Sequence, residues 1–395
     1  MEGFLSPSVL NTYDKPTNPK CGKCGLFRKC NSPKMPMTGE GGEKILVVAE
    51  APGKNEDEEN TQLIGKSGQL LRKHLRECGI DLDRDCWKTN AVICYPGDTP
   101  TPKQVEYCFA NLRATIKETN PEIIIVLGGT AVSSLIGWLW KSSTGKLSRW
   151  VGWQIPDQKL NAWICPTYHP SYILRKDESI YEEHFHDHLE AAVSLRGRPH
   201  PKEPRRWHRD VRIITNTGEA ADAIKKIVAW GEGLAAFDFE TDRLKPDSED
   251  AKIVCCSISH DGKTIAFPWY GCVPSVMKRF MESERIGKIA ANIKFEHRWV
   301  KAKLGIDVAN WAFDTMQAAH QLDNRKGVTG LKFQSYVRLG QPSYDEHIAP
   351  WLKAKLGNEQ NRISKISTRE LLLYCGMDSL LEYKLALMQM EELGV

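Results

Sequence analysis

Residues 234–241 read Leu-Ala-Ala-Phe-Asp-Phe-Glu-Thr, an apolar lead followed by two carboxylates that alternate with two phenylalanines. Successive side chains of a β-strand point to opposite faces. Phe237 and Phe239 would therefore face a core, and Asp238 and Glu240 would stand together on the other face. Neighbouring carboxylates repel each other, so such a pair is usually kept for a hard cation such as magnesium or manganese. The alternative is a solvated polar face on an edge strand.

The totals describe a two-domain globular protein. A chain of 395 residues is too long for one ordinary core. The hydrophobic share of 41% and the charged share of 26% are typical of soluble proteins. No apolar run approaches the length of a membrane span and the N-terminus lacks a signal pattern, so we expect a cytoplasmic protein with no membrane partner. The net charge of +4 is too small to identify a nucleic-acid partner.

Basic residues gather between the two halves. Residues 196–212 hold seven lysines and arginines, two histidines and three prolines. This composition predicts a proline-stiffened linker over residues 198–210, between a domain at 1–197 and a domain at 211–395. The linker could contact DNA or could simply be solvated, and the sequence favours neither alternative.

Eight of the twelve cysteines precede residue 170. In a cytoplasmic protein this bias indicates a metal or cluster site in the first half and argues against a disulfide framework. Cys21 and Cys24 form a C-x2-C knuckle. A zinc site would need a second knuckle, and none follows. The remaining candidates are the single cysteines Cys30, Cys78, Cys86, Cys94, Cys108 and Cys165.

The first half alternates apolar strands with amphipathic helices. Strands are expected at residues 44–49, 87–94, 123–127 and 162–165, with helices at 67–78 and 101–119, which predicts a three-layer α/β sheet. Glu50 follows the first strand, Asn90 lies in the second, and His169 follows the fourth. Ligands of such sheets bind at the carboxyl ends of the strands, although a lone Asn or His there is more often structural.

Six motifs follow one another over residues 21–175: Cys-x2-Cys, Glu-Ala-Pro-Gly, Gly-x-x-Gly-x-Leu-Leu, Thr-Asn-x-x-x-Cys, Glu-x-Cys and His-Pro-Ser. In this order they resemble the family 4 uracil-DNA glycosylases. The resemblance implies an α/β/α sandwich that carries a [4Fe–4S] cluster, for which thiolates are the usual ligands. It assigns those ligands to Cys21, Cys24, Cys94 and Cys108 and leaves the other four cysteines as ordinary buried thiols.

The same resemblance implies roles in base excision. Such an enzyme flips a base out of the stack and reads its Watson–Crick edge, which falls to Asn90. His169 would donate to the uracil oxygen that gains charge as the glycosidic bond breaks. Glu50 would begin the turn that holds the attacking water and the sugar, and Glu56 and Asp57 match the acidic pair lining the uracil pocket.

One departure from the family pattern bears on the expected activity. The family pattern Pro-Phe-Val-Gly is Gln62-Leu63-Ile64-Gly65 here, so Leu63 replaces the ring that stacks on uracil. Base–aromatic stacking contributes ~1–3 kcal/mol, and its loss would slow catalysis roughly 10-fold or more. A weakened glycosylase, one with a shifted base preference, and a silent binding module all remain open.

Three motifs are spaced along the second half: Asp238 and Glu240, then residues 292–296 ending in Glu296, then Tyr374 with Asp378 four residues later. Together they resemble the DEDDy 3′–5′ exonuclease domain of family A DNA polymerases. That domain is a ribonuclease H-like mixed sheet with flanking helices, and we expect an antiparallel meander over residues 234–267 and a long helix over 368–393. The resemblance implies that Asp238, Glu240 and Asp378 hold two magnesium or manganese ions and that Tyr374 orients a water. Glu296, where the family usually has Asp, would bind the second ion. Taken alone, Tyr374 is more often a buried helix tyrosine.

Together these features predict a two-domain DNA-processing enzyme of a bacteriophage replication system. It would recognise or excise uracil or a modified pyrimidine and would proofread 3′ ends. The chain holds no polymerase motif, so we expect a separate polymerase chain or a longer parent protein. The main alternative is a base-sensing module of a polymerase, which Leu63 favours and Glu50, Asn90 and His169 oppose. A purely structural DNA-binding protein would need both sites to be inactive.

Overall fold

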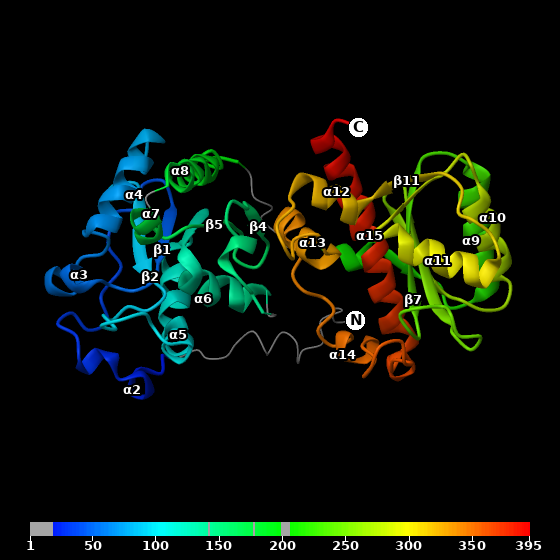
Figure 1. Ribbon diagram of the computed structural model, residues 1–395, viewed down its shortest axis with the longest axis horizontal. Helices are drawn as coiled ribbons and strands as arrows, with labels where there is room; N and C mark the ends of the chain where they lie inside the picture. Colours follow the sequence, from blue (N-terminus) through cyan, green and yellow to red (C-terminus); the bar gives the residue numbers. More distant parts are fainter. Residues whose placement is uncertain (1–18, 141–142, 177, 199–205) are drawn as a thin grey trace. The chain divides into compact units, whose positions relative to one another are not determined.

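The computed structural model describes residues 19–140, 143–176, 178–198 and 206–395. The chain divides into two compact units (Figure 1). Unit 1 comprises Met1–Arg205 with Tyr336–Pro342, and unit 2 comprises Arg206–Ser335 with Ser343–Val395. Part of the predicted basic linker, residues 199–205, lies outside the described residues. Among the described residues, no helix is both long and apolar enough to cross a membrane.

Unit 1 is built on a five-stranded sheet of order β2-β1-β3-β5-β4, with β4 alone antiparallel to its neighbour. Its elements in chain order are α2 (Cys21–Cys24), η1 (Leu26–Arg28), β1 (Ile45–Ala49), α3 (Lys54–Glu59), α4 (Lys66–Glu77), β2 (Cys86–Asn90), α5 (Pro102–Thr119), β3 (Ile123–Leu127), α6 (Gly128–Trp140), η2 (Leu147–Arg149), β4 (Ile155–Asp157), β5 (Ala162–Thr167), α7 (Pro170–Lys176) and α8 (Ser179–Val193).

Helices cover both faces of this sheet. Helices α4 and α8 pack on one face, where Leu71 and Phe185 join the core around Val47. Helices α5 and α6 contact the sheet as well and complete the three layers (Figure 1). The predicted α/β/α sandwich is therefore confirmed. Strand β2 ends at Asn90, earlier than the expected residue 94, because the chain leaves the sheet there toward the cysteines.

Unit 2 contains a six-stranded mixed sheet of order β11-β10-β7-β8-β9-β6. Its elements are η3 (Trp207–Arg209), β6 (Val211–Ile213), α9 (Thr217–Trp230), β7 (Leu234–Thr241), β8 (Ile253–His260), β9 (Lys263–Pro268), α10 (Val273–Glu282), β10 (Gly287–Ala290), α11 (Ile293–Leu304), β11 (Trp311–Asp314), α12 (Thr315–Leu322), α13 (Leu331–Leu339, whose end belongs to unit 1), α14 (Ala349–Leu352), η4 (Ile363–Lys365) and α15 (Thr368–Leu393).

The unit 2 sheet places the opening motif between two helical layers. Strands β7, β8 and β9 form the expected antiparallel meander. Phe237 and Phe239 are buried in a core that includes Ile224 of α9, Phe280 of α10 and Trp299 of α11. The opposite face packs against α15, whose bounds match the expectation (Figure 1). The alternation of faces is confirmed, and the edge-strand alternative is wrong because β7 is an interior strand.

Candidate active sites

The parallel strands of unit 1 bring three polar residues to one edge. Ala49 pairs with Asn90, and Leu127 pairs with Thr167, so strands β1, β2, β3 and β5 end level with one another. Glu50 and His169 follow the ends of β1 and β5, and Asn90 closes β2. This edge is where open α/β sheets bind ligands.

The ring of His169 has a fixed hydrogen-bonding pattern. The backbone N–H of Ser171 donates to its Nδ1 at 3.2 Å, and the Ser171 hydroxyl lies 2.8 Å from the same atom. Because a backbone N–H can only donate, Nδ1 is an acceptor and the proton of the neutral ring sits on Nε2. Burial lowers the pKa of His169, with the Glu50 charge acting in the opposite direction. His169 is thus a neutral Nε2–H donor near pH 7.

A glycine makes room for this histidine. Gly128 begins α6 with φ +84°, and a Cβ there would lie 2.8 Å from the Cβ of His169. In the same turn region, the Thr130 hydroxyl donates to Oε2 of Glu50 at 2.5 Å. The backbone carbonyl of Glu50 accepts from Val92 N–H at 3.1 Å. The Glu50 turn is therefore held from two neighbouring elements.

Asn90 has a partner that the sequence reasoning missed. Its Nδ2 donates to Oε1 of Gln62 at 2.8 Å, and Nε2 of Gln62 donates to the Pro36 carbonyl at 2.8 Å. Gln62 is 0% exposed, and the neighbouring Leu63 is buried as well. Gln62 stands where the family pattern has proline. This amide in place of proline was the sequence feature that could have indicated a partner for Asn90. A buried amide pair, and not an isolated Asn, faces this edge of the sheet.

The acidic pair Glu56 and Asp57 anchors two loops. Oε1 of Glu56 accepts from Gly65 N–H at 3.0 Å, which holds the segment after Leu63. Asp57 is buried and accepts from the backbone N–H groups of Asn31 and Ser32 at 2.9 and 2.8 Å. Asp57 therefore ties α3 to the loop that follows the cysteine knuckle, a contact that sequence spacing does not reveal.

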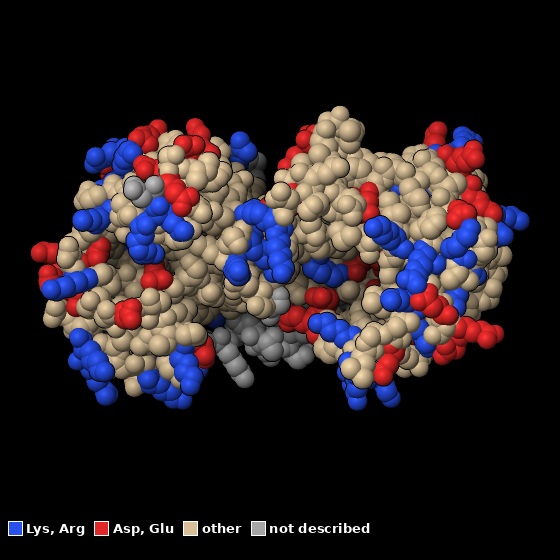
Figure 2. Space-filling view, in the orientation of Figure 1, with Lys and Arg blue, Asp and Glu red and all other residues tan. Residues whose placement is uncertain are grey.

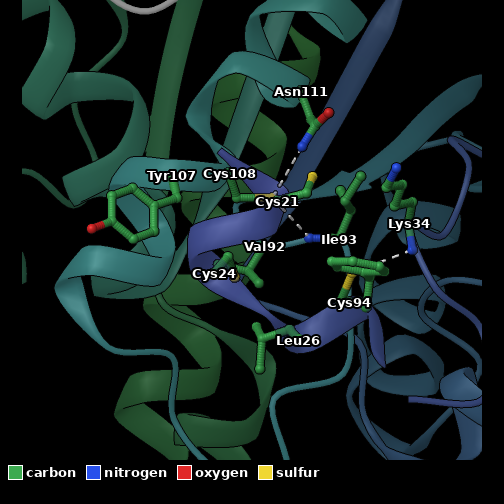
Figure 3. Close-up of a pocket in the computed structure, with 11 residues that line it drawn as sticks. Cys21, Cys24, Leu26, Lys34, Val92, Ile93, Cys94, Tyr107, Cys108 and Asn111 are labelled. Carbon is green, nitrogen blue, oxygen red and sulfur yellow. Dashed lines mark hydrogen bonds between the residues drawn. The ribbon is translucent and has the colours of Figure 1, made fainter. Parts of the chain in front are cut away.

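Four cysteines from three parts of the chain line one pocket (Figure 3). Cys21 and Cys24 come from α2, Cys94 follows β2, and Cys108 lies on α5. Apolar side chains of Leu26, Phe27 and Val92 surround them. Cys30 also lies against Cys94 without lining the pocket, whereas Cys86 and Cys165 belong to the core under the sheet and Cys78 packs against it.

The donors around these sulfurs fit a thiolate-held cluster. Lys34 N–H points to Sγ of Cys94 at 3.2 Å, and Ile93 N–H and the Asn111 amide point to Sγ of Cys108 at 3.4 Å each (Figure 3). Burial raises the pKa of the Cys94 thiol to about 12 and also raises that of Cys108. Both are therefore neutral as free thiols, and binding of a metal centre would deprotonate them. N–H donors aimed at sulfur then tune the bound cluster.

In unit 2, strand β7 and helix α15 build a buried acidic group. One carboxylate oxygen each of Asp238 and Glu240 and the sulfur of Cys375 all lie within 4.8 Å of one another. The pKa of Asp238 is raised mainly by burial and next by the charge of Asp378. The pKa of Glu240 is raised mainly by burial and next by the charge of Asp238. Tyr374 is buried, and the same three carboxylates add to the effect of burial in raising its pKa. The predicted residues therefore share one electrostatic environment.

Glu296 joins this group from α11. It is buried, and burial followed by the charge of Asp238 raises the pKa of its carboxyl. Its Oε2 has no hydrogen-bond partner among the described residues. An orphaned carboxylate oxygen beside other carboxylates is costly unless a cation completes the site. The donor set fits the divalent metal ions that the resemblance implies.

Sequence reasoning missed a fifth carboxylate. Glu382 lies on α15, four residues after Asp378 and on the same helical face. It is 1% exposed, its Oε1 accepts from Ala291 N–H at 3.3 Å, and its Oε2 has no partner among the described residues. After burial, the charges of Asp238, Glu296 and Asp378 raise its pKa. The four-residue spacing was the signal that could have found it.

Two further side chains contact Asp378. Lys332 of α13 and the hydroxyl of Tyr344 both donate to Oδ1 of Asp378, and Lys332 Nζ lies 2.7 Å from the Tyr344 oxygen. The ammonium also lies over the rings of Tyr344 and Tyr374, at 4.1 and 4.4 Å from their centroids. Lys332 supplies positive charge to a site rich in carboxylates. Lys332 directly follows Gly330-Leu331 in the sequence, and no pattern in the sequence marked Lys332 itself as a site residue.

Charges of both signs are interspersed on the face of each unit that Figure 2 shows. Figure 2 shows lysine and arginine side chains beside aspartates and glutamates on the visible face of each unit. This mixture agrees with the small net charge of +4. The carboxylates of the unit 2 group that are buried are Glu240, Glu296, Asp378 and Glu382.

These two folds and sites define a class: a DNA glycosylase-like sandwich joined to a ribonuclease H-like nuclease domain. Residues 36–192 match the family model of the uracil DNA glycosylase superfamily, and residues 211–392 match that of a 3′–5′ exonuclease. A type-4 uracil-DNA glycosylase of Thermotoga maritima is 33% identical over 180 residues, which cover 45% of this chain and 89% of that protein. The chain belongs to the type-4 uracil-DNA glycosylase family and carries a 3′–5′ exonuclease domain in addition. That family implies an iron–sulfur cluster, and the exonuclease domain implies divalent metal ions.

Two phage DNA polymerases are similar to part of this chain. A DNA polymerase of Bacillus phage SP01 is 28% identical over 326 residues, which cover 73% of this chain and 34% of the polymerase. A DNA polymerase of Escherichia phage T5 is 30% identical over 145 residues, which cover 34% of this chain and 17% of that polymerase. The chain thus spans about a third of the length of the SP01 polymerase.

Proposed function

We propose that this protein excises uracil or a related pyrimidine from DNA with unit 1 and removes nucleotides from 3′ ends with unit 2. One observation supports the proposal. In each unit, residues from motifs that are far apart in the chain lie close together, and they carry the functional groups that the proposed reaction needs. The proposed domains are residues 1–197 and 211–395, joined by the basic segment 198–210, whereas the compact units divide at Arg205 and assign Tyr336–Pro342 to unit 1. A DNA substrate fits a cytoplasmic setting, which is the host cytoplasm if the chain is phage-encoded.

In unit 1, the chain's own residues would divide the work of base excision. Asn90, held by Gln62, would read the edge of the flipped base, because its amide can both donate and accept. The Nε2–H of His169 would donate to the pyrimidine oxygen that gains charge as the C1′–N bond breaks. Glu50 would hold the water that attacks C1′, and Leu63 would form part of the pocket wall. Glu56 and Asp57 would keep the surrounding loops in place.

Cys21, Cys24, Cys94 and Cys108 would hold the [4Fe–4S] cluster of unit 1. Such a cluster would cross-link α2, the segment after β2, and α5. Because Asp57 binds the loop next to the knuckle and Glu56 binds the loop after Leu63, loss of the cluster would reach the base pocket through α3.

In unit 2, Asp238, Glu240, Glu296 and Asp378 would hold two magnesium or manganese ions. When bound, such ions activate a water and stabilise the leaving 3′ oxygen. Tyr374 would orient the water, and Lys332 would release Asp378 as the ions enter. The products would be single nucleotides from the 3′ end.

Glu382 extends this site as a positioning residue. It holds the turn between β10 and α11 through Ala291 and lies beside Glu296, so it would fix the longer Glu296 side chain on its ion. We expect Glu382→Gln to weaken Mn²⁺ binding roughly 10–100-fold, as loss of an outer partner of a ligand does. Calorimetry with Mn²⁺ measures this binding without turnover. Glu391→Gln, an exposed glutamate of the same helix, is the matched control, and equal binding by both variants would exclude the role.

One assay separates the two activities. A 5′-labelled oligonucleotide with one internal uracil and a blocked 3′ end is incubated with EDTA, and alkali then reveals abasic sites. Cleavage at uracil that is lost in Asn90→Ala supports excision. Shortening of an unblocked uracil-free strand in Mg²⁺, lost in Asp238→Ala, supports the exonuclease. Failure of either reaction in the wild-type protein with its iron retained would remove that half of the proposal.

A second candidate function rests on Leu63 and the Asn90–Gln62 bond. Without the stacking ring, and with one Asn90 amide hydrogen already engaged, unit 1 would bind a base weakly and would serve a partner polymerase chain or domain as a sensing module. Specific binding of uracil-containing DNA without cleavage would favour this reading.

A further inference from the structure

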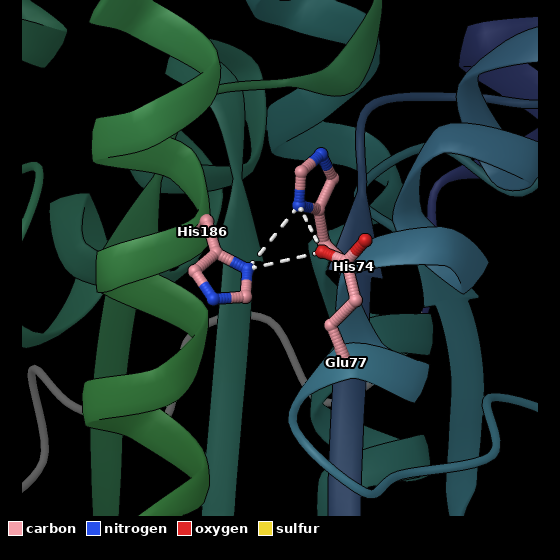
Figure 4. Close-up of side chains that lie close together, drawn as sticks. All are labelled: His74, Glu77 and His186. Carbon is pink, nitrogen blue, oxygen red and sulfur yellow. Dashed lines mark hydrogen bonds and ion pairs between the residues drawn. The ribbon is translucent and has the colours of Figure 1, made fainter.

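A second cluster of metal-ligating side chains lies in unit 1, between helices α4 and α8 (Figure 4). His74 and Glu77 stand three residues apart in the last turn of α4, and His186 faces them from α8. His74 is 3% exposed and packs edge-on against Phe185 at 5.6 Å. Neither proposed reaction uses these residues.

The three donor atoms form a nearly equilateral triangle. Nδ1 of His74 lies 3.3 Å from Nδ1 of His186 and 3.2 Å from Oε2 of Glu77, and the third side, from His186 to Glu77, is 3.4 Å. Zinc bound tetrahedrally at about 2.0–2.2 Å holds its ligand atoms roughly 3.3–3.6 Å apart. The triangle therefore has the size of one face of a zinc tetrahedron.

An outer carboxylate fixes the first histidine in the form that binds metal. Nε2 of His74 lies 3.0 Å from Oε1 of Glu182, and Lys73 holds the same oxygen at 2.8 Å. A carboxylate accepts from Nε2–H and so leaves the lone pair of Nδ1 directed at the triangle. This is the carboxylate–histidine–metal arrangement found around protein zinc sites.

We propose that His74, Glu77 and His186 bind one zinc ion, with Glu182 as the outer partner of His74. Two imidazoles and one carboxylate are a donor set that zinc prefers. Glu77 and His186 have side chains 47% and 32% exposed, so the fourth position opens to solvent and is filled by water.

The bound ion would cross-link the C-terminal end of α4 to α8. Helix α4 begins directly after Gly65, and its Arg72 donates to the carbonyl of Leu63. Cross-linking α4 to α8 would therefore restrict the motion of the loop that carries Leu63. The proposal does not depend on either enzymatic activity, because it rests on the three ligands and their partner alone.

The test measures zinc on the full-length protein, purified anaerobically and freed of loose metal with EDTA. After the EDTA is removed and Zn²⁺ is added, we expect one zinc per chain beside the iron and a rise in Tm. Glu77→Gln and His186→Ala should each weaken zinc binding at least ~10-fold and lose the rise in Tm, and Glu182→Gln should weaken it roughly 10–100-fold. His184→Ala, an exposed histidine two residues from His186, is the matched control and should bind as wild type.

Absorption spectroscopy at the zinc edge identifies the site that is filled. Nitrogen and oxygen neighbours without sulfur are expected. Sulfur neighbours would mean that zinc occupies the cysteine pocket, and this result would overturn the proposal. Equal zinc binding by wild type, Glu77→Gln and His186→Ala would overturn it as well, as would no binding by the wild-type protein. The Tm of each variant in EDTA should equal that of the wild type, which shows that the variants fold.

Discussion

The two candidate active sites meet the problem of buried polar groups in opposite ways. At the sheet edge of unit 1, Asn90, Gln62 and His169 already have hydrogen-bond partners within the protein. In unit 2, Glu296 and Glu382 each leave one buried oxygen without a partner among the described residues. The first site is complete as a protein structure and suits a neutral ligand. The second is electrostatically incomplete until cations arrive.

The contrast matters for stability. An unpaired buried carboxylate lowers the free energy of unfolding by several times more than one hydrogen bond between protein groups raises it. A site of the first kind contributes to its own stability and holds its geometry in advance. A site of the second kind opposes folding of its unit and gains its order from the bound ions. Metal chelation should therefore separate the two activities cleanly.

The strongest way to sharpen this comparison is Asp238→Asn. Removing one charge from the acidic group should cost at least roughly 10²–10³-fold in 3′–5′ exonuclease rate, as loss of a preorganised electrostatic group does. Uracil excision should not change, because Asp238 lies in the other unit. Single-turnover assays on the two oligonucleotides described above measure both. A parallel loss of uracil excision would break the comparison, since the sites would then be coupled.

The reciprocal change is Asn90→Ala. Removing one hydrogen-bonding partner leaves a polar group of the bound base unpaired. The rate of uracil excision should therefore fall by roughly 10²-fold or more. Exonuclease rate and iron content should stay at wild-type values. Iron content is measured with the activity, so that a fall in excision caused by cluster loss would be recognised.

The pH dependence of unit 2 provides a test of intermediate size. The folded state raises the pKa of Asp238, Glu240, Glu296 and Glu382 above their ordinary values, mainly through burial. A folded state that binds protons more tightly than the unfolded state loses stability as pH rises. Without metal, these groups therefore contribute most below about pH 4, where both states are protonated, and their contribution falls as pH rises through the raised values.

Urea unfolding of the metal-free protein from pH 5 to pH 8 measures this slope. Saturating Mg²⁺ should flatten this slope, because the ions replace the protons. Glu382→Gln in EDTA should make the slope shallower, because the variant removes one carboxyl whose pKa the fold raises. A slope that neither Mg²⁺ nor Glu382→Gln changes would mean that the carboxylates are already neutralised in another way.

The smallest expected effect belongs to Leu63→Phe. If Leu63 lines the base pocket, a ring there should restore part of the stacking energy of ~1–3 kcal/mol and raise uracil excision by up to roughly 10-fold. Leu63→Met is the control, since it changes the side chain without adding a ring. Equal rates for the two variants would show that the pocket does not use this position for stacking.

Local patterns, together with the two family resemblances, were enough to predict the fold class of each unit. The alternation of residues 237–240 correctly gave the two faces of β7, because the side-chain period of a strand is set by its backbone. The bounds of α15 were predicted to the residue. Helix α6 was not predicted, because its paired glycines and β-branched residues have low helix propensity and its packing against the sheet decides.

The sequence by itself determined which residue types occur at motif spacing, and thereby both families and the residues proposed for both sites. Only the tertiary structure decided which other side chains join them. Gln62 reaches Asn90, Glu382 lies beside Glu296, and His74 meets His186 across 112 positions of the chain. The physical reason is that strand and helix periods fix neighbours within an element, whereas neighbours between elements depend on how helices pack onto the sheets.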